Sequence, residues 1–169
     1  EFDNHRDLVF QKSAENAVDW YDIRGMHDTL LIETLGKAFG IHSLILEDVA
    51  DVNQRPKFEE YENGVFITFR ALTFNNVSHK INTEQISLYF KTGIALSFQE
   101  TESDLFKIVR ERIIASRGRI RTKGADYLVY SIIDSIVDNY YNVLESVEEE
   151  IEALEESMLE NLEISNKNK

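Results

Sequence analysis

The sequence predicts an α/β protein, built as an α/β/α sandwich with a mixed, largely antiparallel central sheet and a long acidic helix at its C-terminal end. Helical periodicity is the first basis of this prediction, because apolar residues recur every three to four positions in segments on both sides of the centre. The centre itself alternates apolar and polar residues, which is the period of strands. The order of the segments is the third basis of the prediction: a strand and two helices precede the central strands, and two helices follow them.

The segments before the centre have recognisable ends. Ala17–Arg24 alternates apolar residues with acids and predicts a strand. Asp28–Phe39 has a helical period, with Asp28 as the expected N-cap and Gly40 as the residue that ends the helix. Ile41–Val52 is expected to form a second short helix with its apolar residues on one side.

The centre predicts a meander of four adjacent strands, most naturally antiparallel. Asn63-Gly64 is a hairpin signal between the first two strands, and Thr92-Gly93 joins the last two. The expected strands are Lys57–Glu62, Gly64–Phe74, Ile81–Lys91 and Ile94–Gln99. A further short strand is expected at Leu8–Gln11.

Two helices follow the centre. The first is expected over Ser103–Ser116, capped by the side chain of Ser103 or Asp104. The second runs from Ala125 to about Glu163. Over Tyr127–Val143 its apolar residues cover two faces, so we expect this part to be buried in the domain.

From Tyr140 onward the apolar residues of the last helix narrow to a heptad seam. The seam residues are spaced alternately by four and three positions: Tyr140, Leu144, Val147, Ile151, Leu154 and Met158. Nine glutamates lie between Glu145 and Glu163, with no Lys or Arg among them. We therefore divide the chain into an α/β/α domain, residues 1–143, and an acidic helical extension, residues 144–169.

The composition excludes several classes of function. The 169 residues contain no Cys, which rules out disulfides and thiolate metal sites. The net charge of −13 argues against nucleic-acid binding by phosphate neutralisation and favours attraction of cations. The sequence contains no signal peptide and no apolar run of membrane-spanning length. No nucleophile signature or cofactor-binding loop is present, so we do not expect an enzyme.

A basic run interrupts the acidic chain. Residues 107–123 hold seven Lys or Arg and one acid, Glu111. The run lacks a Walker-type phosphate loop, so a solvated surface facing an acidic neighbour, within or between subunits, is the favoured interpretation. The four His residues are far apart in the sequence and do not predict a zinc site.

Four carboxylates lie beside or within apolar segments. Glu47 and Asp48 follow the run Leu44–Leu46, and Asp134 and Asp138 are four residues apart on the last helix. A carboxylate in an apolar setting must be paired, hydrogen-bonded or metal-bound. Oxygen ligands suit hard cations such as Mg²⁺. Two structural alternatives remain open: Asp48 as a cap, and a salt bridge from Asp134 to the basic run.

Several blocks of this sequence, in order, resemble the cytosolic N-terminal domain of the CorA family of divalent-cation (Mg²⁺) transporters, from about Trp20 to Glu160. The blocks are Ile41–Val49 (IHSLILEDV), Gln54–Glu59 (QRPKFE), Thr83–Leu88 (TEQISL), Leu96–Glu100 (LSFQE), Val109–Ile113 (VRERI), Arg117–Arg121 (RGRIR), Ala125–Asp134 (ADYLVYSIID) and Val137–Tyr140 (VDNY).

The resemblance implies a homopentamer in which Mg²⁺, bound between neighbouring subunits, holds a channel closed. It assigns Glu47, Asp48 and Asp134 to these intersubunit sites, and we add Asp138 to the candidate set. A further ligand, on a stalk helix, would lie beyond Lys169, as would both membrane helices and their Gly-Met-Asn signature. The resemblance therefore implies an inner-membrane protein with this domain on its cytoplasmic side, and a fragment that cannot transport by itself.

The expected function is thus a metal-sensing, regulatory domain of a CorA-like magnesium transporter, with Mg²⁺ as the ligand and Co²⁺ as a possible substitute. The heptad seam is expected to pack against the stalk helix. A zinc-transporting relative of the same family is one alternative. A non-metal module that docks a basic partner through the acidic seam is the other.

Overall fold

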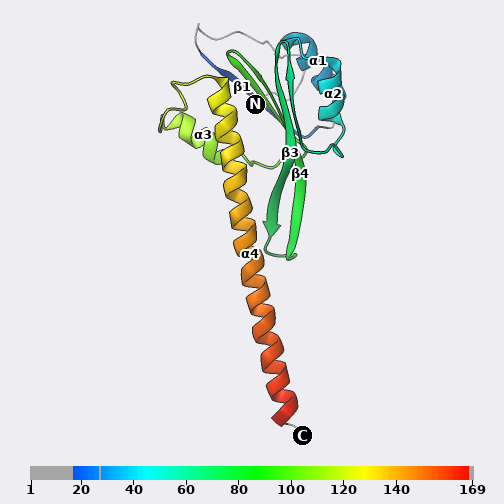
Figure 1. Ribbon diagram of the computed structural model, residues 1–169, viewed down its shortest axis with the longest axis vertical. Coiled ribbons are helices and arrows are strands. Elements are labelled where there is room, and N and C mark those ends of the chain that lie inside the picture. Colours follow the sequence, from blue (N-terminus) through cyan, green and yellow to red (C-terminus); the bar gives the residue numbers. More distant parts are fainter. Residues whose placement is uncertain (1–16, 27, 168–169) are drawn as a thin grey trace.

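The computed structural model describes residues 17–26 and 28–167, with side chains as far as Leu159 (Figure 1). The expected strand at Leu8–Gln11 lies outside these residues. The elements are β1 (Asp19–Arg24), α1 (Thr29–Phe39), α2 (Ser43–Ala50), β2 (Lys57–Tyr61), β3 (Gly64–Asn75), β4 (Lys80–Lys91), β5 (Ile94–Gln99), α3 (Lys107–Ile114) and α4 (Ala125–Lys167). This order confirms the predicted α/β class.

One five-stranded sheet, in the order β1-β5-β4-β3-β2, forms the middle layer. Strands β2 to β5 are an antiparallel meander, as predicted. Strand β1 pairs in parallel with β5, with Asp19 beside Ile94 and Arg24 beside Gln99. The sheet is therefore mixed and largely antiparallel.

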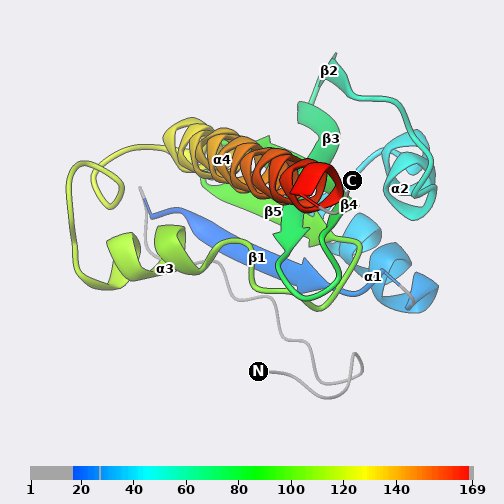
Figure 2. The same cartoon turned by 90° about the horizontal axis from the view of Figure 1, so that it is seen from below.

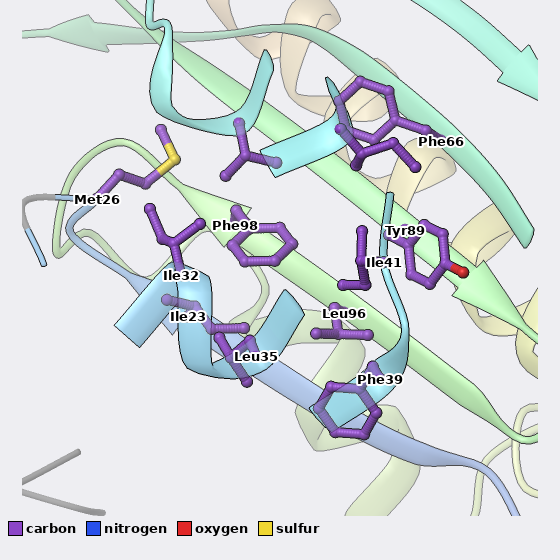
Figure 3. Close-up of a cluster of buried hydrophobic side chains, with 12 residues drawn as sticks. Ile23, Met26, Ile32, Leu35, Phe39, Ile41, Phe66, Tyr89, Leu96 and Phe98 are labelled. Carbon is purple, nitrogen blue, oxygen red and sulfur yellow. The ribbon is translucent and has the colours of Figure 1, made fainter. Parts of the chain in front are cut away.

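Helices α1 and α2 cover one face of the sheet and enclose the first core. Leu35 and Phe39 of α1 and Ile45 and Val49 of α2 are buried against sheet residues such as Phe98. Figure 3 shows this core in close-up, with Leu35 and Phe39 facing the strands. Burial on this scale is the main source of stability in such a layer.

Helices α3 and α4 cover the other face and enclose the second core. Val109 of α3 and Leu128, Ile132 and Ile136 of α4 pack against sheet residues that include Leu88. Figure 2 looks nearly along α4 and shows it across the sheet from α1 and α2. The predicted sandwich of two helical layers around one sheet is confirmed.

The ends of α1 are those the sequence predicts. The Asp28 carboxylate accepts a hydrogen bond from the Leu31 backbone N–H (3.0 Å) at the first turn. Gly40 ends the helix with a positive φ of 64°, a conformation that glycine adopts without steric cost. Helix α2 is shorter than predicted and begins at Ser43, where the His42 side chain accepts from Leu44 N–H (3.2 Å).

The predicted start of α3 is wrong, because the helix begins at Lys107 rather than at Ser103. The proposed caps are engaged elsewhere. The Ser103 hydroxyl donates to buried Glu84 (2.8 Å), and Asp104 forms an ion pair with Arg24 (3.0 Å). Tertiary contacts thus hold residues 101–106 in turns ahead of the helix.

Helix α4 packs on the long β3–β4 hairpin and then leaves it (Figure 1). The Asn139 side chain donates to Leu72 O (2.5 Å), and the Tyr140 hydroxyl donates to Arg70 O. Further along, the ring of His79 at the hairpin tip contacts Glu150 (2.6 Å).

Four residues of the predicted seam, Leu144, Ile151, Leu154 and Met158, are exposed, whereas Tyr140 and Val147 are half-buried. Leu144 is 63% exposed, Ile151 51% and Leu154 62%. Among the described helices, none is long and apolar enough to cross a membrane.

The expectation that Tyr127–Val143 is buried on two faces is only half right. One face is buried in the second core, but Tyr130, Val137 and Tyr141 are exposed. These three residues lie one to two turns apart along one side of α4. We call them the outer stripe of α4.

Candidate metal site

The first carboxylate pair, Glu47 and Asp48, lies near the C-terminal end of α2, the helix that packs on α1. Glu47 is exposed, and its side chain forms no ion pair or hydrogen bond with the described residues. Asp48 is half-buried, and its backbone carbonyl accepts from the Gln85 side chain (3.2 Å), which fixes the helix to β4. Leu44, one turn earlier, is exposed beside the pair.

Lys57 occupies the position of a counter-ion to Asp48. Its Nζ lies 2.5 Å from Asp48 Oδ2 and 3.5 Å from Glu59 Oε2. Burial acts to lower the pKa of Lys57, but the hydrogen bond and charge of Asp48, together with Glu59, outweigh it and leave this pKa raised. The Asp48 side chain is therefore not a helix cap, and it already has a counter-ion. A metal ion would have to compete with the ammonium group of Lys57 for its carboxylate.

Glu59 is itself oriented by a neighbour on the same strand. The Tyr61 hydroxyl donates to Glu59 (2.7 Å), and this hydrogen bond raises the pKa of Tyr61 to about 12 because the neutral phenol is the donor. The same bond lowers the pKa of the Glu59 carboxyl. The Asp48 side of the site is thus a small network with one cation and two carboxylates.

The second carboxylate pair lies on α4. Asp134 is half-buried and Asp138 is exposed, one turn apart on the side of the helix that carries the outer stripe. In the described part of the chain neither carboxylate has an ion pair or a hydrogen bond. The alternative salt bridge from Asp134 to the basic run is not formed. Arg110, the basic residue on α3 that does pair, contacts Asp22 (2.6 Å) and Asp104 instead.

The structure brings each pair together but not the two pairs. Helix α2 and helix α4 cover opposite faces of the sheet. Across residues 17–26 and 28–159, no three His, Asp or Glu side chains lie close enough to hold a metal ion together. A hydrated Mg²⁺ usually takes one or two carboxylates from a protein, so each pair supplies that number of ligands, and no third carboxylate of the described residues joins either pair.

Sequence reasoning missed Lys57 as part of this arrangement. The lysine is nine residues from Asp48 and begins β2, so the contact depends on how the loop between α2 and β2 folds back. Helical or strand periodicity carries no signal for such a contact.

Comparisons with known proteins give a consistent result. A family model described as "CorA-like Mg2+ transporter protein" matches residues 15–169. The Cobalt/magnesium transport protein CorA of Thermotoga maritima is 47% identical over 153 residues, which cover 90% of this chain and 43% of that protein. The protein of the same name from Methanocaldococcus jannaschii is 27% identical over 141 residues, covering 83% of this chain and 43% of that one.

The fold also matches a solved structure. The soluble domain of CorA from Methanocaldococcus jannaschii superposes with a TM-score of 0.65 at 25% identity, covering 78% of this chain and 52% of that one. The chain spans less than half the length of the two curated relatives.

Proposed function

Because the chain belongs to the CorA family of Mg²⁺ transporter proteins, we propose that it is the cytosolic, cation-sensing domain of a magnesium transporter and that it binds Mg²⁺, or Co²⁺ in its place, at interfaces between subunits. The observation that carries the proposal is the setting of Asp134 and Asp138. They are carboxylates without a partner among the described residues, on the side of α4 that also exposes Tyr130, Val137 and Tyr141. Exposed aromatic and apolar residues around carboxylates are typical of an interface.

The positions of the two pairs favour a ring of subunits. In a head-to-tail interface, one face of a subunit meets a different face of its neighbour, and repeated rotation closes a ring. Glu47 and Asp48 lie with α2 on one face, and Asp134 and Asp138 lie with α4 on the other. A head-to-tail contact is the arrangement that joins them, and a pentamer is the ring we propose.

If carboxylates of two neighbouring subunits bind the same cation, the arrangement of the subunits depends on the cation concentration. A cation that binds only the associated state stabilises that state by mass action. When the cation leaves, like-charged carboxylates remain across the interface and repel each other. We propose that this change controls gating of a pore formed by parts of the protein beyond these residues, in the inner membrane, with this domain on the cytoplasmic side. The proposed role is regulatory rather than catalytic.

The test is a titration of the chain with Mg²⁺ and separately with Co²⁺, followed by thermal unfolding and sedimentation velocity. At a cation concentration one hundred times the dissociation constant, we expect a rise of roughly 5 to 10 °C in the unfolding midpoint. Faster-sedimenting species should appear over the same range of concentration. The variants Glu47→Gln and Asp134→Asn should lose both effects.

The matched controls are Glu33→Gln on α1 and Glu152→Gln on α4, which remove one exposed carboxylate each from the same helical layers. They should respond like the parent chain. Equal responses of all four variants, or no response to either cation, would refute the proposed sites. A response to Zn²⁺ alone would favour a zinc-transporting relative.

A further inference from the structure

A pocket of about 470 Å³ lies on the α3 side of the molecule, apart from both carboxylate pairs. Its walls are apolar and come from three elements: Val18 and Trp20 of the β1 region, Ile113 of α3 and Leu128 of α4. Arg121 and Lys123, in the connection from α3 to α4, line it as well. A concave apolar site with a few convergent polar groups is the usual form of a small-molecule pocket.

Three basic residues line this pocket, Arg110, Arg121 and Lys123, and only Arg110 has an acidic partner in the described part of the chain. Arg110 is the one member of the basic run that forms ion pairs there, and its guanidinium is held by Asp22 and Asp104. Arg121 donates a hydrogen bond to the Ser116 hydroxyl (3.2 Å), which fixes its direction without neutralising its charge. Lys123 forms no ion pair or hydrogen bond with the described residues. Two positive charges therefore stand at the pocket in a chain whose net charge is −13.

The glutamates of α4 cannot neutralise these charges within one subunit. Figure 1 shows α3 beside the N-terminal half of α4, with the C-terminal half at the opposite end of the molecule. From Ala125 to Glu145 the helix rises by about 30 Å. Such a distance is more than three Debye lengths at physiological ionic strength, where the Debye length is about 8 Å. Within one chain, the acidic neighbours that the basic run was expected to face are therefore Asp22 and Asp104, which pair with Arg110, and not the glutamates of the extension.

We propose that this pocket binds a small organic phosphate, with the phosphate on Arg121 and Lys123 and a flat apolar body against Trp20 and Ile113. Arg and Lys are the side chains that bind phosphate by charge-assisted hydrogen bonds. The apolar walls distinguish such a ligand from a bare anion.

The test uses ADP as the probe, with a chelator present so that no divalent cation takes part. Trp20 is the one tryptophan of the chain, so its fluorescence reports directly on the pocket. We expect saturable change on titration with ADP, weakened by added salt. The double variant Arg121→Gln/Lys123→Gln should bind ADP at least about tenfold more weakly.

Two further variants test whether the position of the charges and the apolar wall of the pocket matter for ADP binding. Lys37→Gln/Lys80→Gln removes two exposed lysines elsewhere and should bind ADP like the parent chain. Ile114→Ser changes an exposed residue of the pocket rim, which leaves the cores intact. It should weaken ADP binding several-fold and leave the weaker binding of inorganic phosphate unchanged.

Several results would overturn the proposal. One is inorganic phosphate binding as tightly as ADP, and another is ADP binding that the Arg121→Gln/Lys123→Gln change leaves intact. Absence of any fluorescence change at millimolar ADP would do so too. Sedimentation of the chain with phosphatidylglycerol vesicles, without ADP binding, would assign the basic surface to a membrane. A loss of self-association in the double variant, without ADP binding, would assign it to contact between copies.

Discussion

Lys57 is the residue that most changes the interpretation of the carboxylates on α2. Its ammonium group lies 2.5 Å from Asp48 and gives that side chain a cation within its own chain. Asp134 and Asp138, by contrast, have no such partner among the described residues. The two halves of the proposed interface therefore differ in charge: Asp48 on α2 has a counter-ion within its own chain, whereas neither carboxylate on α4 has one.

Removal of this internal cation should strengthen metal binding. In Lys57→Met, Asp48 and Glu59 lose their counter-ion, so we expect several-fold tighter binding of Mg²⁺ to the chain by isothermal calorimetry. Without metal, the free energy of unfolding should fall by about 1 kcal/mol or less, because the pair is only partly buried. Lys91→Met, which removes a half-buried lysine that donates to Phe39 O, is the control and should not tighten Mg²⁺ binding. Unchanged affinity in Lys57→Met would show that Asp48 is not a ligand.

At the scale of elements, α4 combines two parts that behave differently. Its first half is held by the second core and by hydrogen bonds to the β3 backbone. Its second half has the His79–Glu150 contact and then exposed apolar residues, including Ile151 and Leu154. The helix therefore changes from a layer of the sandwich to a projecting arm.

Truncation should separate these parts. A chain that ends after Ile151 keeps the Glu150 contact, and all the residues it loses whose burial the structure describes, 152–159, are exposed. Its free energy of unfolding should therefore match that of the parent within about 0.5 kcal/mol. A chain that ends after Ile136 removes Asn139 and Tyr140 and should be destabilised by several times that amount, since each buried hydrogen bond contributes about 1 kcal/mol. Urea denaturation measures both. Equal losses would mean that the arm is part of the folded unit, against a boundary near residue 143.

The elements show which kinds of signal the sequence carries. Helix α1 was predictable to the residue because its two ends depend on local chemistry, Asp28 and Gly40. The start of α3 was not, because Ser103 is drawn to Glu84, which lies nineteen residues earlier in the sequence. The same reason hides the Lys57–Asp48 contact and the pocket at Trp20. Periodicity reports which face of an element is apolar, but not which tertiary partner a polar side chain selects.

At the scale of the whole molecule, one sheet separates two cores that share its strands. Ile45 lies in the first core and Ile132 in the second, and both are almost fully buried. Because the strands between them are common to both cores, we expect the domain to unfold as one cooperative unit rather than layer by layer.

Substitutions in the two cores test this expectation. Ile45→Val and Ile132→Val should each reduce the free energy of unfolding by about 1 kcal/mol. The double variant should show the sum within about 0.5 kcal/mol, since the sites do not touch. Fluorescence and circular dichroism should give one coincident transition in urea for all three variants. Two separated transitions would show that the layers unfold independently.

The parallel pairing of β1 with β5 has a consequence for the order of folding. Strands β2 to β5 pair with sequence neighbours, whereas the pairing of Asp19 with Ile94 closes a segment that contains the whole meander. Closing so long a segment costs chain entropy before any contact offsets it. During synthesis β1 leaves the ribosome before the other described strands, but its partner β5 is the last of these strands to be made. Until β1 pairs with it, the edge of β5 is open to strands from other chains, so this step is the one most exposed to aggregation.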